Sequence, residues 1–423
     1  MSNILILTST YLPFPGANGI NTHAVINELK KKHHKITVLS TKSNDTENDF
    51  EIIDGIEIYR ISQSNFTKKN IELENSEKDI TKHLKLKILF LIRKVEILLK
   101  WNKFPNFDKE QNIKTLKLAE EIIERKKIKS LISIYKPYTN IYTLIKIKKK
   151  HPNIKCGVYF LDLLDSMTRP KIMTKKYFNK KIDNENLKIL SETDYILVPL
   201  SSKKYYQKLI FNEYIEKIDF TDFPTLKKSN VTTVKSNIEL NNISFTYAGT
   251  LNLKYRNPNY FLNTFFELNK MMDNISINIL GKNNCESMIN DYSKVLSLKN
   301  YGFLSQDKVE QVNENSNFLI NISNSIENAV PSKIFELFST GKPIINFVHK
   351  ENDSSVRYFN LYPASFNFFY WKDFNSQLDD MYDFIQNNKD TRIEPSIIEN
   401  IFFMNLPEYT VKKIEKRICQ EPK

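Results

Sequence analysis

Cysteine and glycine are scarce in this chain of 423 residues. The three cysteines, Cys156, Cys285 and Cys419, are far apart and form no CxxC pair. Neither a zinc site nor a disulfide framework fits that spacing, whereas a reducing, cytoplasmic setting does. Only eight glycines occur, and they form neither a GxGxxG nor a GxxxxGKS/T motif. The sequence therefore supports neither a nicotinamide or flavin fingerprint nor a P-loop NTPase.

Long apolar runs are also missing. The N-terminus has no basic segment followed by a long apolar core, so we expect no signal peptide. The most apolar stretch, 88–99, is broken by Arg93, Lys94 and Glu96, and it is too short and too charged to span a bilayer. Hydrophobic residues nevertheless make up 41% of the chain, as in globular proteins, and its length suits two or three domains.

The net charge is +13. A surface of this kind attracts polyanions, anionic membranes or phosphorylated ligands. No nucleic-acid-binding motif accompanies the charge, so we expect no nucleic-acid partner.

Short apolar runs alternate with helical patterns along the chain, which favours parallel sheets with crossover helices. We expect a first domain at 1–226, a second at 227–394 that begins with a polar linker (227–242), and a helical segment at 395–423 that packs back on the first. The fold class is α/β, with two doubly wound, Rossmann-like domains facing across a ligand-binding cleft. An Asp54-Gly55 pair predicts a hairpin over 50–58. The other expected strands are 4–8, 36–39, 131–134, 158–160, 195–198, 244–248, 276–280, 318–322 and 344–348.

Most of the glycines follow predicted strands or end a predicted helix, where the backbone needs positive φ or approaches a ligand closely. These are Gly16, Gly19, Gly249, Gly281, Gly302 and Gly341. Gly16, Asn18 and Gly19 lie in a loop between the first strand and the first helix, where N–H groups would hold a phosphate or an acceptor. For each glycine, the alternative is ordinary turn chemistry.

The most informative segment is NAVPSKIFELFSTGKPII, at 328–345. Pro331 favours the start of a helix, Lys333 lies in its first turn, and Glu336 follows on the same face. The helix N-terminus and Lys333 would neutralise phosphate, and Glu336 would accept hydrogen bonds from both ribose hydroxyls. The alternative is a solvated ion pair between Lys333 and Glu336.

This segment resembles the donor-binding motif of GT-B glycosyltransferases of families 4 and 1, in which a PSKxxExxxxGKPII run is characteristic. Segments 193–201, 247–251, 277–281 and 301–303 resemble the same family in the same order. The resemblance covers nearly the whole chain, with 61–125 the least matched. The resemblance implies that Arg256, or Lys254 as a second candidate, contacts the donor diphosphate. The donor-binding residues that it implies are Gly249, Lys254, Arg256, Gly281, Asn328, Ala329, Val330, Ser332, Lys333 and Glu336.

One position departs from the family pattern. Many retaining members carry a Glu on the loop that holds the donor sugar, and the equivalent residue here is Asn328. An amide can hydrogen-bond a sugar hydroxyl but cannot stabilise positive charge. The stereochemistry therefore stays open, and the neighbouring Glu327 is a further candidate for a sugar contact.

In the first half, Asp162 and Asp165 end a predicted strand in a segment that resembles the DxRDPW run of polysaccharide glycosyltransferases, with the Arg and the Pro-Trp replaced. A carboxylate there would serve as a base for an acceptor hydroxyl, although Asp165 could instead cap the following helix. His23 would position acceptor or phosphate, or it is structural. Three other histidines lie beside lysines and are expected on the surface: His33, His34 and His151.

Apolar residues at helical spacing in 83–104 are flanked by lysines and arginine. We expect a helix whose apolar face joins the core. The alternative is a peripheral helix on the anionic inner face of a membrane.

The predicted function is transfer of a hexosyl-type unit from a UDP- or GDP-linked sugar to a glycan or lipid-linked acceptor in bacterial surface polysaccharide synthesis. No metal or cofactor is expected, because Arg256, Lys333 and the helix dipole supply the positive charge. Two alternatives remain: a catalytically degenerate GT-B homologue that acts as a binding subunit, and a sugar-nucleotide epimerase.

Overall fold

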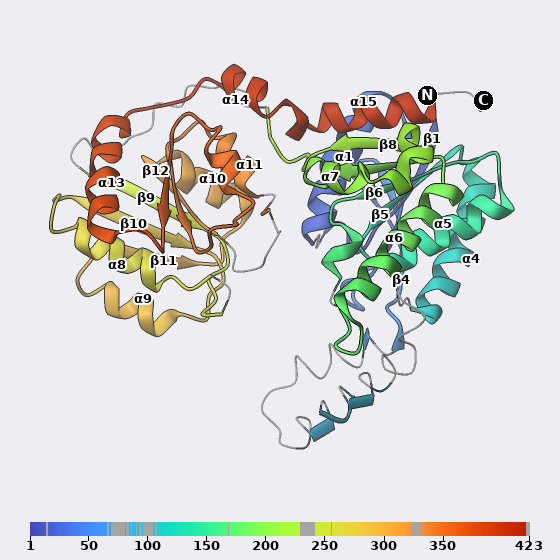
Figure 1. The fold of residues 1–423 in the computed structure, drawn as a ribbon, viewed down its shortest axis with the longest axis horizontal. Coiled ribbons are helices and arrows are strands. Elements are labelled where there is room, and N and C mark those ends of the chain that lie inside the picture. The colour runs from blue at the N-terminus through green and yellow to red at the C-terminus, as the bar shows by residue number, and fades with distance from the viewer. Residues whose placement is uncertain are drawn as a thin grey trace. The chain divides into compact units, whose positions relative to one another are not determined.

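The structure is a computed structural model that describes residues 1–13, 16–65, 67–68, 81, 84–85, 87–89, 91–92, 95, 105, 108–167, 169–228, 242–254, 256–323, 330–331 and 333–419. The chain forms two compact units (Figure 1). Unit 1 comprises Met1–Pro224 with Pro407–Lys423, and unit 2 comprises Thr225–Leu406. The domain boundaries predicted from the sequence were 226/227 and 394/395. Most of the expected linker, 229–241, lies outside the described residues.

Unit 1 contains a sheet that has eight strands in the described part of the chain, in the order β3-β4-β2-β1-β5-β6-β7-β8. Among these strands, β3 alone is antiparallel, and it pairs with β4 across the predicted Asp54-Gly55 turn, where both residues have positive φ. The hairpin prediction is therefore confirmed. The strands are β1 (Asn3–Leu7), β2 (Lys35–Thr41), β3 (Phe50–Ile53), β4 (Ile56–Ile61), β5 (Ser130–Tyr135), β6 (Lys155–Phe160), β7 (Tyr195–Pro199) and β8 (Ile218–Thr221).

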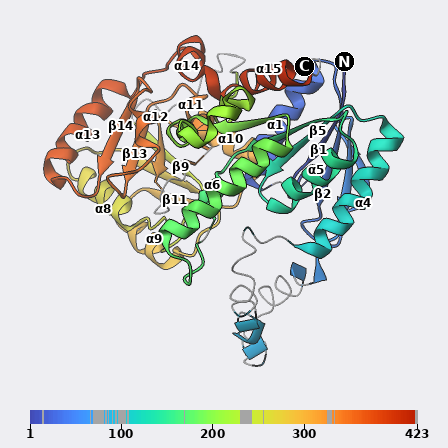
Figure 2. The same cartoon turned by 45° about the vertical axis from the view of Figure 1, so that its right-hand side comes forward.

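The C-terminal helix α15 (Pro407–Ile418) belongs to unit 1, as predicted for the C-terminal segment, and lies beside α1 (Ala17–Lys31) (Figure 2). Residues 395–406, which the prediction included in that segment, belong to unit 2. Val411 and Ile414 of α15 share a buried core with Val25 and Leu29 of α1. Burying an aliphatic side chain contributes about 1.5–3 kcal/mol, so this apolar stripe fixes the returning helix. The other longer helices of unit 1 are α4 (Lys109–Lys126), α5 (Tyr138–Lys150) and α6 (Lys175–Glu192), and the shorter ones are α7 (Lys203–Tyr206), η2 (Leu164–Ser166), η3 (Leu200–Ser202) and η4 (Leu209–Lys217).

Unit 2 contains a parallel sheet, which has six strands among the described residues, in the order β11-β10-β9-β12-β13-β14. Helices α8 (Asn259–Leu268), α9 (Glu286–Tyr292) and α13 (Phe374–Asn388) contribute to a single core with one face of this sheet (Figure 1). The strands are β9 (Ile243–Ala248), β10 (Ile275–Leu280), β11 (Leu298–Gly302), β12 (Phe318–Ile322), β13 (Ile344–Val348) and β14 (Ser365–Phe369). The helices are α8 (Asn259–Leu268), α9 (Glu286–Tyr292), α10 (Gln306–Glu314), α11 (Lys333–Phe338), α12 (Val356–Phe359), α13 (Phe374–Asn388), α14 (Pro395–Ile401) and η5 (Phe403–Asn405).

Both sheets have a switch point where the strand order reverses. It lies between β1 and β5 in unit 1 and between β9 and β12 in unit 2. In open parallel sheets, ligands bind outside the carboxyl ends of the strands at such a point. In unit 2, the chain after β9 leads to Arg256 and the chain after β12 leads to Lys333, so the fold directs both cations to that edge.

Candidate donor-binding site

The chain after β9 approaches the end of the neighbouring strand β10 closely. The N–H of Gly249 donates to the carbonyl of Leu280 at 2.8 Å, and Gly281 has φ of +125°. A Cβ on Gly281 would lie 2.2 Å from the carbonyl oxygen of Gly249, so no side chain fits. Close packing of two strand ends accounts for Gly281, and donor contact by these glycines stays a prediction.

Arg256 is held by the connection between β9 and α8. Its backbone N–H and carbonyl pair with Asn252 at 2.8 and 3.1 Å. Burial raises the pKa of the Tyr247 hydroxyl, and the charge of the adjacent Arg256 guanidinium, which hydrogen-bonds Tyr247, opposes that shift. The buried Nε of Arg256 bonds no protein group in the described part of the chain. A guanidinium with a free buried donor suits an anionic ligand.

Lys333 and Glu336 lie one turn apart on α11, and both are half-buried. Burial lowers the pKa of Lys333; the Glu336 carboxylate opposes this shift and the Arg256 charge adds to it. Burial raises the pKa of Glu336, whereas Lys333 and Lys227 oppose that rise. The charges of Glu336 and Arg256 thus both act on Lys333, and the alternative of a solvated ion pair between Lys333 and Glu336 does not describe this half-buried environment.

A pocket of about 250 Å³ lies between α10 and α11. The Lys333 and Glu336 side chains line it from α11, and Gln306 and Glu310 line it from α10. Glu310 is paired with Lys227 at 2.7 Å, which, together with Gln306, lowers the pKa of the Glu310 carboxyl group. The lining is thus rich in hydrogen-bonding groups, as a polar ligand such as a nucleoside requires.

The structure describes only some of the remaining predicted donor-binding residues. Val330 is half-buried, and Lys254 is exposed, with its backbone N–H donating to the side chain of Asn252 at 2.8 Å. Their contacts with a donor stay predictions. Four predicted residues lie outside the described part of the chain: Glu327, Asn328, Ala329 and Ser332.

In unit 1, the predicted loop before the first helix is shorter than expected. Helix α1 begins at Ala17, so Asn18 and Gly19 lie in its first turn and their placement in a loop is wrong. The Gly16 N–H donates to Thr10 Oγ1 at 3.2 Å, and Asn18 Nδ2 donates to the Tyr135 carbonyl at 3.2 Å. These groups connect the start of α1 to the chain after β1 and to the end of β5, and a phosphate or acceptor contact stays a prediction.

Asp162 and Asp165 follow β6 at the carboxyl edge of the same sheet. Asp162 is half-exposed and pairs with Lys136 at 3.4 Å. Asp165 is exposed and lies in the 3₁₀ turn η2, whereas Thr174 caps the following helix α6. The alternative role of Asp165 as the cap of that helix is therefore wrong, and a catalytic role for either carboxylate stays a prediction.

Both ring nitrogens of His23 are engaged inside unit 1. Nδ1 lies 2.8 Å from the Tyr11 hydroxyl, and Nε2 lies 2.9 Å from the side-chain amide of Asn27. Burial lowers the pKa of His23, so the ring is neutral at neutral pH. The geometry favours the structural alternative that the sequence left open.

Comparison with solved structures identifies the architecture. A glycosyltransferase from Rickettsia africae shares 14% identity at a TM-score of 0.61, with 100% of this chain and 99% of that one covered. The lipopolysaccharide outer core galactosyltransferase WaaB shares 14% identity at a TM-score of 0.55, with 99% of each chain covered. The catalytic domain of starch synthase IV from Arabidopsis thaliana, bound to ADP and acarbose, shares 8% identity at a TM-score of 0.54. The match covers 99% of this chain and 98% of that one.

The chain has the GT-B fold. The resemblance predicted from sequence is confirmed at the level of the fold. No protein-family model and no curated protein matches the sequence. Within the described residues of this GT-B chain, no group of three His, Cys, Asp or Glu side chains is placed to hold a metal ion.

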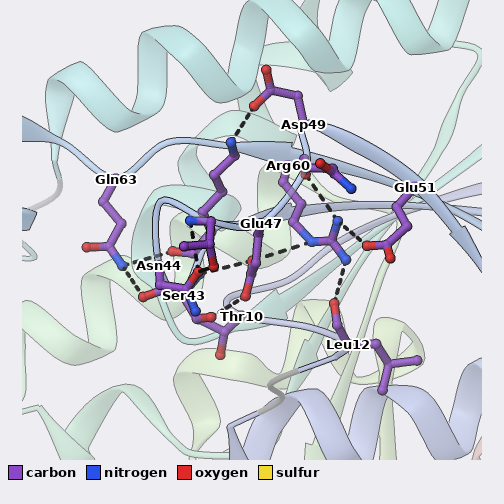
Figure 3. A network of polar contacts seen from close by, with 12 residues as sticks. Thr10, Leu12, Ser43, Asn44, Glu47, Asp49, Glu51, Arg60 and Gln63 are labelled. Carbon is purple, nitrogen blue, oxygen red and sulfur yellow. Dashed lines mark hydrogen bonds and ion pairs between the residues drawn. The ribbon is translucent and has the colours of Figure 1, made fainter.

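Sequence reasoning missed a fully buried arginine in the first unit of this GT-B chain (Figure 3). Arg60 pairs with Glu51 at 2.9 Å and lies 3.5 Å from the buried carboxylate of Glu47. It also donates to the carbonyl of Leu12 at 2.6 Å. Arg60 therefore ties the loop after β1 to the end of β4. Because Ile56, Ile58 and Arg60 alternate along one strand, period-two spacing on the buried face was the signal available in the sequence.

Proposed function

We propose that this protein is a glycosyltransferase and that unit 2 binds a nucleotide-sugar donor at the switch point between β9 and β12. The observation that carries the proposal is the convergence of Arg256, Lys333 and Glu336 at that edge. Two neighbouring cations match a diphosphate, and the carboxylate one turn along matches the hydroxyls of the attached ribose. The starch synthase IV domain of the same fold was solved with ADP bound, which supports a nucleoside diphosphate as the ligand here.

In this proposal, Arg256 and Lys333 act by stabilising negative charge. Breaking the bond between the sugar and the diphosphate leaves negative charge on the departing phosphate. Arg256 and Lys333 would stabilise that charge without a proton transfer, which is the role of preorganised cations in phosphoryl and glycosyl chemistry. In the same proposal, Asp162 rather than Asp165 accepts the proton of the acceptor hydroxyl, because it lies nearer the end of β6 and pairs with Lys136.

The acceptor proposed is a glycan or a lipid-linked glycan, and the unit transferred is a hexose. The galactosyltransferase WaaB, which acts on the lipopolysaccharide outer core, supports this class of acceptor. Turnover is tested by incubating purified protein with UDP-, GDP- and ADP-sugars and measuring nucleotide release with and without bacterial glycolipid extract. Release that rises with extract supports a transferase. Donor binding without release in any condition would favour the catalytically degenerate binding subunit instead.

We also propose peripheral membrane contact through the segment 83–104. Its described residues are helical, and their apolar side chains are exposed except for the half-buried Leu89, so the preferred expectation of a core helix is wrong for the exposed ones. The exposed apolar residues are Leu84, Ile88, Leu91, Ile92 and Val95. Lys85 and Lys87 are exposed beside them, as on a helix that lies on an anionic surface. Among the described residues, no helix is long and apolar enough to cross a bilayer.

Membrane contact is tested by sedimentation with vesicles. The double variant Ile88→Glu/Leu91→Glu is expected to bind vesicles of 30% phosphatidylglycerol at least tenfold more weakly than wild type, because it places two carboxylates on the apolar, anion-facing surface. The control Leu209→Glu changes another exposed leucine of unit 1, which is 84% exposed, and should bind as wild type does. An equal loss of vesicle binding in the double variant and in Leu209→Glu, or no vesicle binding by wild type, would contradict the proposal.

A further inference from the structure

A second polar cluster lies at the carboxyl edge of the sheet in unit 2. His349 directly follows β13 and Tyr370 directly follows β14, and these two strands are neighbours (Figure 2). The two rings are in contact, with centroids 4.1 Å apart and planes at 67°. Tyr260, in the first turn of α8, stacks on Tyr370 with centroids 3.8 Å apart. Two strand ends and one helix start therefore contribute to the cluster.

Two polar atoms of this cluster are buried without a protein partner. Neither Nε2 of His349 nor the hydroxyl of Tyr370 makes a hydrogen bond within the described part of the chain. Burying a polar group without a bond is costly, and most native buried polar atoms avoid it. Two such atoms on touching rings are available to bond a molecule other than this chain, a water or a ligand.

The cluster is attached to the strand that leads to Lys333, the lysine proposed to bind the diphosphate. The His349 backbone N–H donates to Ser323 Oγ at 3.0 Å, and Ser323 directly follows β12. The described chain then resumes at Val330, three residues before Lys333. The cluster and the proposed diphosphate site therefore share one edge of one sheet, on neighbouring strands.

The chemistry of the cluster is neutral. Burial lowers the pKa of His349; the carboxylate of Asp353 opposes the shift and Lys350 adds to it. Burial raises the pKa of the Tyr370 hydroxyl, so that it stays protonated. A neutral imidazole has one N–H donor and one acceptor nitrogen, and a phenol hydroxyl donates and accepts. These groups match the hydroxyls of a sugar and contribute no charge for phosphate.

We propose that His349 and Tyr370 bind hydroxyl groups of the sugar that the diphosphate carries, and so help to select the sugar. This inference rests on the proposed function. It adds a sugar-recognition role to two residues outside the matched sequence motif, while Arg256, Lys333 and Glu336 bind the nucleotide.

The test compares each diphosphate with its sugar conjugate by isothermal titration calorimetry, using UDP with UDP-glucose, ADP with ADP-glucose and GDP with GDP-mannose. In wild type, one conjugate should bind more tightly than its free diphosphate. Tyr370→Phe removes only the hydroxyl, and His349→Phe replaces the imidazole by an apolar aromatic ring. Each should weaken binding of that conjugate about tenfold, the effect of one lost hydrogen bond, and leave the free diphosphate within about twofold.

Two control variants in unit 1 also remove a buried polar atom that has no hydrogen-bond partner in the described part of the chain. They are His151→Phe and Tyr195→Phe, and both should bind every ligand as wild type does. The inference is overturned if the His349 and Tyr370 variants leave the conjugate affinity unchanged, or weaken diphosphate and conjugate equally. If wild type binds no diphosphate at all, the proposed function itself fails. That result differs from a wild type that binds diphosphate without any gain from the sugar, which overturns this inference alone.

Discussion

Replacing Arg256 and Lys333 together by alanine is expected to abolish measurable binding of nucleoside diphosphates. Each residue would donate a charge-assisted hydrogen bond to phosphate, and such bonds contribute about 1.5–3 kcal/mol. Each single variant should therefore bind roughly 10- to 100-fold more weakly, and the double variant weaker still. Titration calorimetry with UDP, ADP and GDP measures the loss. Unfolding of the free proteins by heat shows whether the variants remain folded.

Two surface lysines of unit 2 serve as comparisons for this prediction. Lys270 pairs with Glu267 at 2.8 Å on the surface, so Lys270→Ala should leave affinity unchanged although it removes the same charge. Lys254→Ala distinguishes the two candidates for the diphosphate contact. A large loss in Lys254→Ala together with wild-type affinity in Arg256→Ala would show that the assignment to Arg256 is wrong.

The affinity for nucleoside diphosphates should also depend on pH and fall at alkaline pH. The pKa of Lys333 in the free protein is lowered by burial and by Arg256, and a bound diphosphate favours the charged lysine. Binding at alkaline pH must therefore take up a proton, so affinity falls as pH rises through the lowered pKa of Lys333. In Lys333→Ala, this contribution to the alkaline decline should disappear.

Replacing Arg60 by methionine is expected to destabilise unit 1 by about 3–5 kcal/mol. Breaking a buried ion pair leaves the remaining charge without compensation, and this loss is of that size. The remaining charge here is Glu47, whose side chain is 4% exposed and whose carboxylate also accepts from the Ser43 N–H at 3.2 Å. Urea unfolding followed with a probe in unit 1 gives the stability. Hydrogen exchange of the Thr10–Leu12 amides should increase, because Leu12 loses its bond to Arg60.

A neighbouring exposed pair provides the control for Arg60. Lys68 pairs with Asp45 at 2.7 Å, with the Asp45 side chain 67% exposed, so Lys68→Met should cost at most about 1 kcal/mol. The double variant Arg60→Met/Glu47→Gln should recover part of the stability, since it removes the buried uncompensated charge. Equal costs for Arg60→Met and Lys68→Met would refute the assigned role of Arg60.

The central strands of both sheets could be predicted from sequence because they are buried on both faces. The expected strands 318–322 and 344–348 coincide with β12 and β13. The strands that sequence reasoning missed, β8, β11 and β14, all lie at sheet edges. An edge strand has one unpaired side and needs fewer apolar residues, as Lys299 and Asn300 in β11 illustrate. The edge strand β3 was found because its Asp54-Gly55 turn gives a hairpin signal.

The candidate site was only partly predictable. Lys333 and Glu336 follow from their spacing on a helix after Pro331, and that signal is local. By contrast, His34 was expected on the surface but is buried, 3.2 Å from Glu415, a residue far away in the sequence. His349 drew no attention either, because its partner ring belongs to the next strand. Contacts between distant segments decide such positions, and a single sequence does not contain them.

The central claim is that the Glu336 carboxylate accepts hydrogen bonds from the ribose hydroxyls of the donor nucleotide. Its most direct test is a calorimetric comparison of each ribonucleoside diphosphate with its 2′-deoxy analogue, in wild type and in Glu336→Ala. Wild type should bind the deoxy analogue about tenfold more weakly, and the variant should bind both equally, because the group that recognises the hydroxyl is gone. A variant that still prefers the ribonucleotide as strongly as wild type does would contradict the account.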